Sequence, residues 1–337
     1  MKLIQKTLIV LILLLYINCQ NLGLEEKKKD NTSILALAAL TTSQNTSNTI
    51  GSTNNTSSTS RTKQQVLEDY NTYYLGSNVT SSNLGWTGST SGCNAGTVSS
   101  DADSKVAMRI NYFRRQTGLP DLITIDSSVQ SKAQEAALIM LANNTLTHTP
   151  TSTMTCYTSG GAEAAGKSNL AFGTQASGSV TAYIQDSGSN NAAVGHRRWL
   201  LYSKLDRVGH GSTTSPNAIW VIGYSKGNTL NLPEFVSWPP KGFVPNTLAF
   251  ARWSFSIPNQ SANFSNATIT MTNSTGANIT LTREPISNGY GDNTVVWIPS
   301  GISTTNTTDV TYRVNITGVT IETTTKDYTY DVTLFKP

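Results

Sequence analysis

The hydrophobic pattern of this chain changes its period once, close to residue 232. Before this point apolar residues recur every three to four positions, which is typical of amphipathic helices. Beyond it, short segments alternate apolar and polar residues, which is typical of half-buried strands. One fold type cannot satisfy both periods, because helices and strands present their side chains differently. The sequence therefore predicts an α/β part followed by an all-β part, and 337 residues suffice for both.

Two helices are the clearest predictions in the first part. One spans residues 101–117, with Ser100 as its candidate cap and Gly118 as its stop. The other starts at Asp126 and ends at residues 143–144. A shorter helix is expected around 178–186 and a buried strand over 218–222. Helices interspersed with strands predict a layered α/β domain.

The second part carries short alternating runs separated by Gly, Asn and Pro, typical of an antiparallel β-sandwich of immunoglobulin-like type. The expected strands are Ala251–Ile257, Ala267–Thr272, Ile279–Thr282, Thr294–Ile298, Val310–Ile316 and Tyr328–Leu334. A rigid turn at Trp238-Pro239-Pro240 marks the junction. We expect one domain over residues 70–232 and another over 233–337, the latter acting as a structural partner or spacer.

The N-terminus resembles a bacterial lipoprotein signal over residues 1–18. Lys2 and Lys6 form a basic start, an apolar run covers Leu8–Ile17, and Cys19 follows Asn18. In such a signal the cysteine becomes the first mature residue and carries lipid. The alternative is an ordinary secretory signal cut nearby. The apolar run is too short to span a bilayer, and both interpretations predict an exported protein, at a bacterial envelope or cell surface or secreted.

Residues 19–69 are predicted to form a disordered tether, since a Ser/Thr/Asn-rich tract buries too little apolar area to offset its ordering entropy.

The chain has three cysteines. With Cys19 assigned to lipid, Cys93 and Cys156 remain as a pair, and in an oxidising compartment we expect a disulfide between them. The alternative is two buried free thiols.

The charge pattern excludes a nucleic-acid partner. Charged residues make up 13% of the chain, the net charge is +4, and neither half is strongly basic or acidic. The expected partners are a membrane, through the lipid anchor, and an unknown lipid, peptide or polysaccharide.

All three histidines, His148, His196 and His210, fall in the first part. Histidine titrates near neutral pH and is the commonest metal ligand, so this grouping suggests a site. The alternative for each is a structural role beside a helix end or strand. For His210, which lies between two glycines in an expected strand, we predict the structural role.

Residues 105–224 resemble the CAP superfamily, also called the SCP or pathogenesis-related-1 family, of secreted α-β-α sandwich proteins. The matching segments are Arg109-Ile110-Asn111, Gly118-Leu119-Pro120, Leu146-Thr147-His148, Ser168-Asn169-Leu170-Ala171, Tyr183-x-x-Asp186, Gly195-His196-Arg197-Arg198-Trp199 and Val208-Gly209-His210-Gly211. The Gly-His-Arg-Arg-Trp segment is similar to the bacterial branch.

The resemblance implies a cleft with two histidines and two acidic residues. His148 and His196 match the histidines, and Asp186 matches one acid on a shorter side chain. Ser168 stands where the family has the second acid. Such a cleft can hold zinc or another divalent cation, or transfer protons. With a hydroxyl in place of one carboxylate, we expect only weak metal binding by His148, His196 and Asp186.

The function expected from this cleft is binding of a lipid, a peptide or an envelope polymer. The alternative is a hydrolase, either metal-dependent or using Ser168, a histidine and Asp186 as a triad, and enzyme activity stays open. No Gly-x-Ser-x-Gly elbow surrounds Ser168. A third hypothesis is a purely structural envelope protein. A hydrogen bond between Ser168 and a histidine would favour the hydrolase.

Overall fold

A four-stranded sheet forms the centre of the N-terminal region, which we define as residues 61–232. The computed structural model describes residues 61–337 except residue 228. The strand order is β1-β3-β4-β2, in which β1 runs parallel to β3 and the other pairs are antiparallel. The strands are β1 Thr124–Ile125, β2 Ser168–Ala171, β3 Arg207–Ser212 and β4 Asn217–Trp220.

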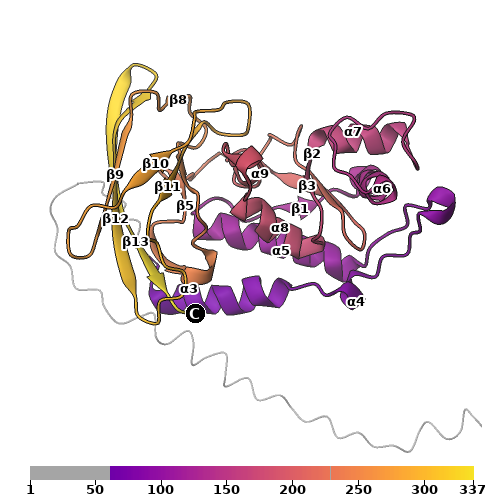
Figure 1. Cartoon of the computed structure of the whole chain (residues 1–337), viewed down its shortest axis with the longest axis horizontal. Coiled ribbons are helices and arrows are strands. Elements are labelled where there is room, and N and C mark those ends of the chain that lie inside the picture. Colours follow the sequence, from indigo (N-terminus) through magenta and orange to yellow (C-terminus); the bar gives the residue numbers. More distant parts are fainter. Residues whose placement is uncertain (1–60, 228) are drawn as a thin grey trace, which may run out of the picture. The chain divides into compact units, whose positions relative to one another are not determined.

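Helices cover both faces of this sheet. α6 and α7 pack on β3 and β4 from one side, and α5 and α8 lie on the other side (Figure 1). The helices are α3 Lys63–Asp69, α4 Ser81–Leu84, α5 Ser100–Gln116, α6 Ser127–Asn143, α7 Ser159–Lys167, α8 Ala176–Gln185 and α9 Gly195–Leu200. The predicted α-β-α sandwich is confirmed.

Caps explain where the helices begin and end. Ser99, one residue before the predicted cap Ser100, accepts a hydrogen bond from the backbone N–H of Ala102 and starts α5. Gly118 follows its end with φ +78°, a left-handed conformation that favours glycine. α6 starts after Asp126 as predicted.

The described helices α3, α4, α7 and α9 escaped the prediction from periodicity. α7 has the sequence SGGAEAAGK, which carries few large apolar side chains, and α9 has six residues, fewer than two helical turns. The predicted helix at 178–186 is α8, and the predicted strand at 218–222 ends earlier, at Trp220.

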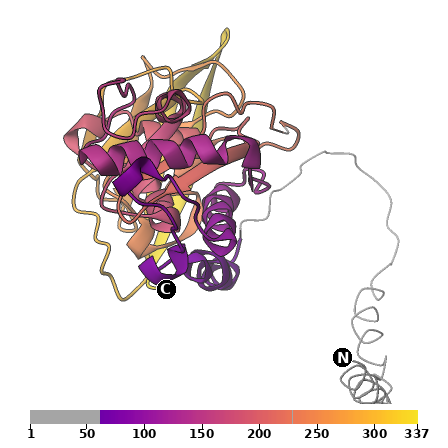
Figure 2. The ribbon, with the colours of Figure 1, turned by 90° about the vertical axis from the view of Figure 1, so that its right-hand side faces the viewer.

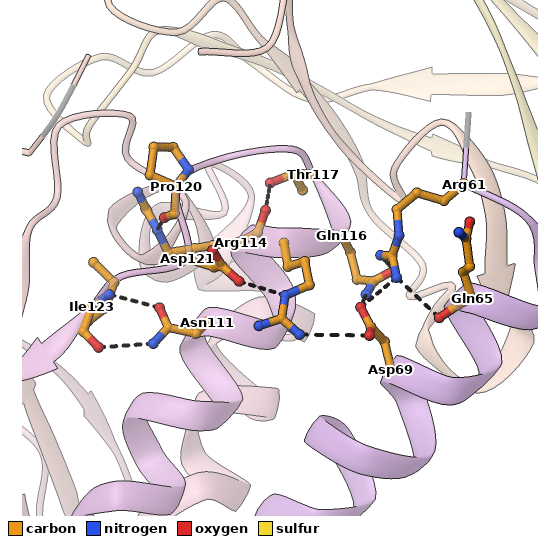
Figure 3. A network of polar contacts seen from close by, with 11 residues as sticks. Arg61, Gln65, Asp69, Asn111, Arg114, Gln116, Thr117, Pro120, Asp121 and Ile123 are labelled. Atoms are coloured by element: carbon orange, nitrogen blue, oxygen red, sulfur yellow. Dashed lines mark hydrogen bonds and ion pairs between the residues drawn. The ribbon is translucent and has the colours of Figure 1, made fainter. Parts of the chain in front are cut away.

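Residues 61–69 were predicted as part of the tether, and this is wrong. They form α3 and the turn before it, because Thr62 and Gln65 make a capping box and Val66 is buried. Arg61 binds Asp69 of α3 and the side chain of Gln116 in α5, so α3 is joined to α5 (Figure 3). The predicted signal, Cys19 and residues 19–60 of the tether lie outside the described residues.

Two stacked sheets form the C-terminal region, residues 233–337, and confirm the β-sandwich. One sheet has the order β10-β11-β7-β5, and the other β6-β13-β12-β8, with β9 also paired to β12. The strands are β5 Val236–Trp238, β6 Gly242–Pro245, β7 Trp253–Ser256, β8 Ala262–Asn263, β9 Thr268–Asn273, β10 Leu281–Arg283, β11 Thr294–Pro299, β12 Val310–Ile321 and β13 Thr324–Phe335. Aromatic and β-branched side chains fill the space between the sheets.

One strand pair departs from the all-antiparallel prediction. The turn at Pro239-Pro240 carries the chain from β5 in one sheet to β6 in the other, where β6 runs parallel to β13. The C-terminus consequently lies beside α3, as Figures 1 and 2 both show. Lys63 of α3 stands over the ring of Phe335 and pairs with Asp309. The two ends of the described chain therefore lie next to each other, where α3 contacts the C-terminal region.

Buried contacts join the two regions at the predicted junction. Trp238 packs edge-on against Phe113 of α5, with ring centroids 5.1 Å apart. Arg197 of α9 donates to the carbonyl oxygen of Arg252 at 2.9 Å and to the hydroxyl of Ser254 at 3.0 Å. The boundary near Trp238 stays a prediction. In the described part of the chain, no helix has the length and apolar character needed to cross a membrane.

The predicted disulfide between Cys93 and Cys156 is confirmed. It joins the segment before α5 to the segment between α6 and α7, across a sequence separation of 63 residues. A crosslink of this kind stabilises a protein mainly by restricting its unfolded chain.

We expect reduction of this disulfide to lower the free energy of unfolding by about 4 kcal/mol, the chain-entropy value for a loop of this length. Denaturant unfolding with and without dithiothreitol measures the change. The Cys93→Ser/Cys156→Ser double variant should show the same loss and no response to the reductant. Equal stability of the oxidised and reduced proteins would contradict the prediction.

Candidate functional site

A cleft of about 310 Å³ opens beside the start of β2 and the start of α9. Its size is within the range of pockets that hold small ligands. Segments from both regions contribute to its wall. The lining residues are His148, Gly166, Ser168, Asn169, Asn190, Asn191, Ala193, Gly195, His196, Trp199, Val221, Ile222 and Tyr290.

His148 reaches the cleft from the loop after α6. Its Nδ1 lies 2.8 Å from the carbonyl oxygen of Ala165 in α7. A carbonyl can only accept, so Nδ1 carries the hydrogen and donates it. When the ring is neutral, Nε2 is therefore an acceptor, and none of the described residues bonds to it.

His196 is held by the carboxylate of Asp186. Its Nδ1 lies 2.8 Å from Asp186 Oδ1, and the backbone N–H groups of His196 and Arg197 donate to Oδ2. The ring of Tyr183 stacks on the imidazole, with centroids 5.4 Å apart. These contacts fix both the orientation and the tautomer of His196, so that Nε2 is an acceptor when the ring is neutral.

Asp186 itself lies beneath the cleft and not in it. Its side chain is fully buried, and it follows α8 in a left-handed conformation with φ +52°. The guanidinium of Arg197 lies nearby and compensates the buried carboxylate. Burial lowers the pKa of Arg197 to about 10, and the charge of Asp186 opposes that shift. The pair is thus a charged support for His196.

Tyr183 links the support to the cleft wall. Its hydroxyl donates toward the backbone oxygen of Asn169 at 3.0 Å and toward Asn217 Oδ1 at 2.9 Å. Burial raises the pKa of Tyr183 well above its ordinary value, so the hydroxyl keeps its hydrogen. The side chain of Asn169 in turn donates to the carbonyl oxygen of His196 at 3.0 Å. Strand β2 and helix α9 are therefore joined directly behind the cleft.

Ser168 begins β2 and is 5% exposed. Its Oγ has no hydrogen-bond partner among the described residues, so it is bonded to neither His148 nor His196. A serine nucleophile needs a base within hydrogen-bond reach. The structure brings Ser168 and both histidines to one cleft but does not assemble them as a triad.

The predicted metal ligands are only partly brought together. His148 and His196 line the cleft, whereas both oxygens of Asp186 are occupied by hydrogen bonds beneath it. Among the described residues, no group of three His, Cys, Asp or Glu side chains is placed to hold a metal ion. Catalytic zinc sites use three protein ligands. Metal binding by His148, His196 and Asp186 stays a prediction.

His210 lies away from the cleft, in β3. It is buried, and its Nδ1 is 2.6 Å from Asp103 Oδ1 of α5. This contact joins the sheet to a covering helix, which agrees with the structural role expected for it.

Several lining residues were missed by the sequence analysis. Asn169 and Trp199 stand within the segments that carry the family resemblance, and that position was an available signal. Tyr290 lies in the loop between β10 and β11, far along the chain, and no sequence pattern connects it to the histidines.

The structure thus combines an α-β-α sandwich with two oriented histidines in one cleft. This is the combination that the family resemblance implied. Residues 108–224 match the family model CAP, described as the cysteine-rich secretory protein family. This part of the chain is therefore a CAP domain, in agreement with the resemblance noted over residues 105–224. A search of the curated proteins gives no significant match.

We expect Asp186→Asn to invert the tautomer of His196. The amide oxygen of Asn can still accept from the backbone N–H groups, while its NH₂ group would donate to Nδ1 and move the ring hydrogen to Nε2. The ¹⁵N chemical shifts of the ring nitrogens at pH 8 report the tautomer. His148, which bonds to a carbonyl, serves as the internal control. An unchanged His196 spectrum would show that Asp186 does not set its tautomer.

Proposed function

We propose that this protein is an exported CAP-domain protein that binds an extracellular ligand in the cleft beside His148 and His196. The observation that carries the proposal is the arrangement of the two imidazoles. Each donates through Nδ1 to a fixed acceptor behind it and leaves Nε2 without a partner among the described residues. Two acceptors held in fixed orientation in one cleft suit recognition of a ligand.

Two further observations favour binding over turnover. Ser168 Oγ is not hydrogen-bonded to either histidine, so no activated nucleophile is formed. The described residues also offer no set of three metal ligands. The dyad of His196 and Asp186 could also activate water as a general base, and the cleavage assay below tests that alternative.

The histidine signals test this proposal directly. We would titrate the full chain with palmitate, with tetraalanine and with a mixture of neutral trisaccharides, and follow the Hε1–Cε1 NMR signals. We expect at least one probe to shift the signals of both His148 and His196 while leaving buried His210 unchanged. The bound probe should be recovered intact.

Three outcomes of this titration are decisive. If no probe shifts either histidine, binding in the cleft is refuted. If a probe is cleaved, and cleavage is lost in His196→Gln, the hydrolase alternative is correct. Equal shifts at His210 and at the cleft histidines would indicate a general effect and also refute the proposal.

We further propose that Cys19 is lipidated and holds the protein at a bacterial envelope or cell surface. The basic start, the apolar run and the cysteine follow one another in the order of a lipoprotein signal. A CAP domain is typical of extracellular proteins, and the disulfide fits an oxidising compartment. Neither feature distinguishes an anchored protein from a secreted one.

Metabolic labelling with an alkyne fatty acid tests the anchor in the native host. The wild-type protein should incorporate the label and partition with membranes, because its first mature residue carries acyl chains. Cys19→Ser should lose both properties, whereas Cys93→Ser/Cys156→Ser should keep the label. A labelled Cys19→Ser protein would refute the assignment.

A further inference from the structure

The cleft is built by both regions, because the C-terminal region supplies Tyr290. Arg198 of α9 holds the loop that carries this residue. Its guanidinium donates to the carbonyl oxygens of Ser287 at 2.6 Å and Asp292 at 3.1 Å. It also stands 5.3 Å from the centroid of the Tyr290 ring. One arginine therefore fixes both ends of the loop and the ring between them.

Close packing adds to this fixation. A Cβ atom on Gly195 would lie 2.8 Å from Cδ1 of Tyr290, so the ring rests directly on the glycine backbone. The preceding Val194 is buried with φ +44°, a strained conformation for a β-branched residue. At the other end of the loop, Asp292 accepts from the backbone and hydroxyl of Ser203. Tyr290 is nevertheless 37% exposed, so part of its ring is free to meet a ligand.

The cleft wall carries no formal charge while the histidines are neutral. Among its described lining residues, none is Lys, Arg, Asp or Glu. A charged ligand would lose hydration on entry and gain no opposite charge. The wall therefore suits an uncharged ligand.

The free polar groups of the wall include acceptors and donors, the latter being the indole N–H of Trp199 and the hydroxyl of Tyr290. The acceptors include Nε2 of His148 and of His196. The NH₂ groups of Asn169 and Asn191 each donate one hydrogen to the backbone oxygens of His196 and Ser187. Each amide keeps its second N–H and its Oδ1 atom for a ligand. Ser168 Oγ, buried and without a described partner, can donate or accept. A ligand that satisfies this set must present several neutral groups that can both donate and accept.

Hydroxyl groups of a sugar meet this requirement better than the other expected ligands. An acyl chain has no donors and would leave these acceptors unpaired, which costs free energy. A peptide backbone offers N–H groups that only donate and C=O groups that only accept, whereas each sugar hydroxyl can do either. A sugar ring offers many hydroxyl donors, and its C–H faces can stack on the negative face of an aromatic ring such as Tyr290.

We propose that the cleft is a binding site for a neutral sugar, completed by Tyr290 of the C-terminal region. The ring of Tyr290 stacks on the sugar, and the sugar's hydroxyl groups donate to Nε2 of His148 and His196 and pair with Ser168. This inference rests on the proposed function, namely that the cleft binds a ligand. It also assigns the C-terminal region a part in recognition beyond that of a spacer.

Binding of the full chain to a panel of neutral oligosaccharides, including triacetylchitotriose, tests the inference by calorimetry. We expect at least one neutral sugar to bind and to shift the NMR signals of both cleft histidines. Where triacetylchitotriose binds, its deacetylated, cationic counterpart should bind at least tenfold more weakly, because the wall offers no counter-charge.

Variants separate the role of Tyr290 from a general effect. Tyr290→Ala should raise Kd at least tenfold, while Tyr290→Phe, which keeps the ring, should stay within threefold. Phe172→Ala removes an aromatic ring of similar exposure (40%) outside the cleft and should bind as the wild type does. Thermal unfolding of each variant verifies that the fold is retained.

The outcomes distinguish this inference from the proposed function. If no neutral sugar binds but palmitate or tetraalanine shifts His148 and His196, the cleft is a binding site and the sugar inference is overturned. If a sugar binds and Tyr290→Ala has no effect, the composite site is overturned. If no probe of any class binds, both proposals fail.

Discussion

The buried guanidinium of Arg197 is the interaction on which the rest of the structure depends. It donates to the carbonyl oxygens of Ile184, Gln185 and Arg252 and to the hydroxyl of Ser254, and it lies near the carboxylate of Asp186. A buried charge is tolerated only where such partners surround it. Removal of any one segment would leave part of this charge unsatisfied. The end of α8, the start of α9 and strand β7 are consequently fixed relative to one another.

Two consecutive arginines in α9 support different parts of the site. Arg197 stands behind the carboxylate that orients His196, and Arg198 holds the loop that carries Tyr290. Burial lowers the pKa of Arg198 to about 10, but both side chains stay charged at neutral pH. The Gly-His-Arg-Arg-Trp segment thus supplies the imidazole, two supports and an aromatic wall residue within one short helix. Its Gly195 also leaves the space that the ring of Tyr290 occupies.

The sequence predicted those parts of the structure that depend on local patterns. The limits of α6 and the β-sandwich follow from periodicity, capping and turn residues, whereas the α-β-α sandwich was implied by the family resemblance. The parallel pairing of β6 with β13 could not be foreseen, because it depends on how the chain crosses between sheets. α3 was missed because one buried residue, Val66, gives almost no periodic signal.

The same distinction holds for the candidate site. His148, His196 and Ser168 were recognised through segments that resemble a family, and the structure brings them to one cleft. Asp186 was predicted as a cleft ligand, but its side chain is fully buried, and the charge of Arg197 interacts with it there. Tyr290 belongs to a loop of the other region and reaches the cleft through contacts with α9. Tertiary contacts of this kind leave no trace in a single sequence.

Because both regions contribute to the cleft wall, ligand binding and the stability of the contact between the regions are linked. Because Tyr290 of the C-terminal region lines the cleft with residues of the N-terminal region, a ligand stacked on Tyr290 as proposed would touch both regions. Binding to the joined form stabilises it by RT ln(1 + [L]/Kd), about 2.7 kcal/mol at a hundredfold excess over Kd. The ligand-bound protein would therefore require more free energy than the ligand-free protein to separate its two regions. The ligand would reversibly stabilise the contact between the CAP domain and the β-sandwich.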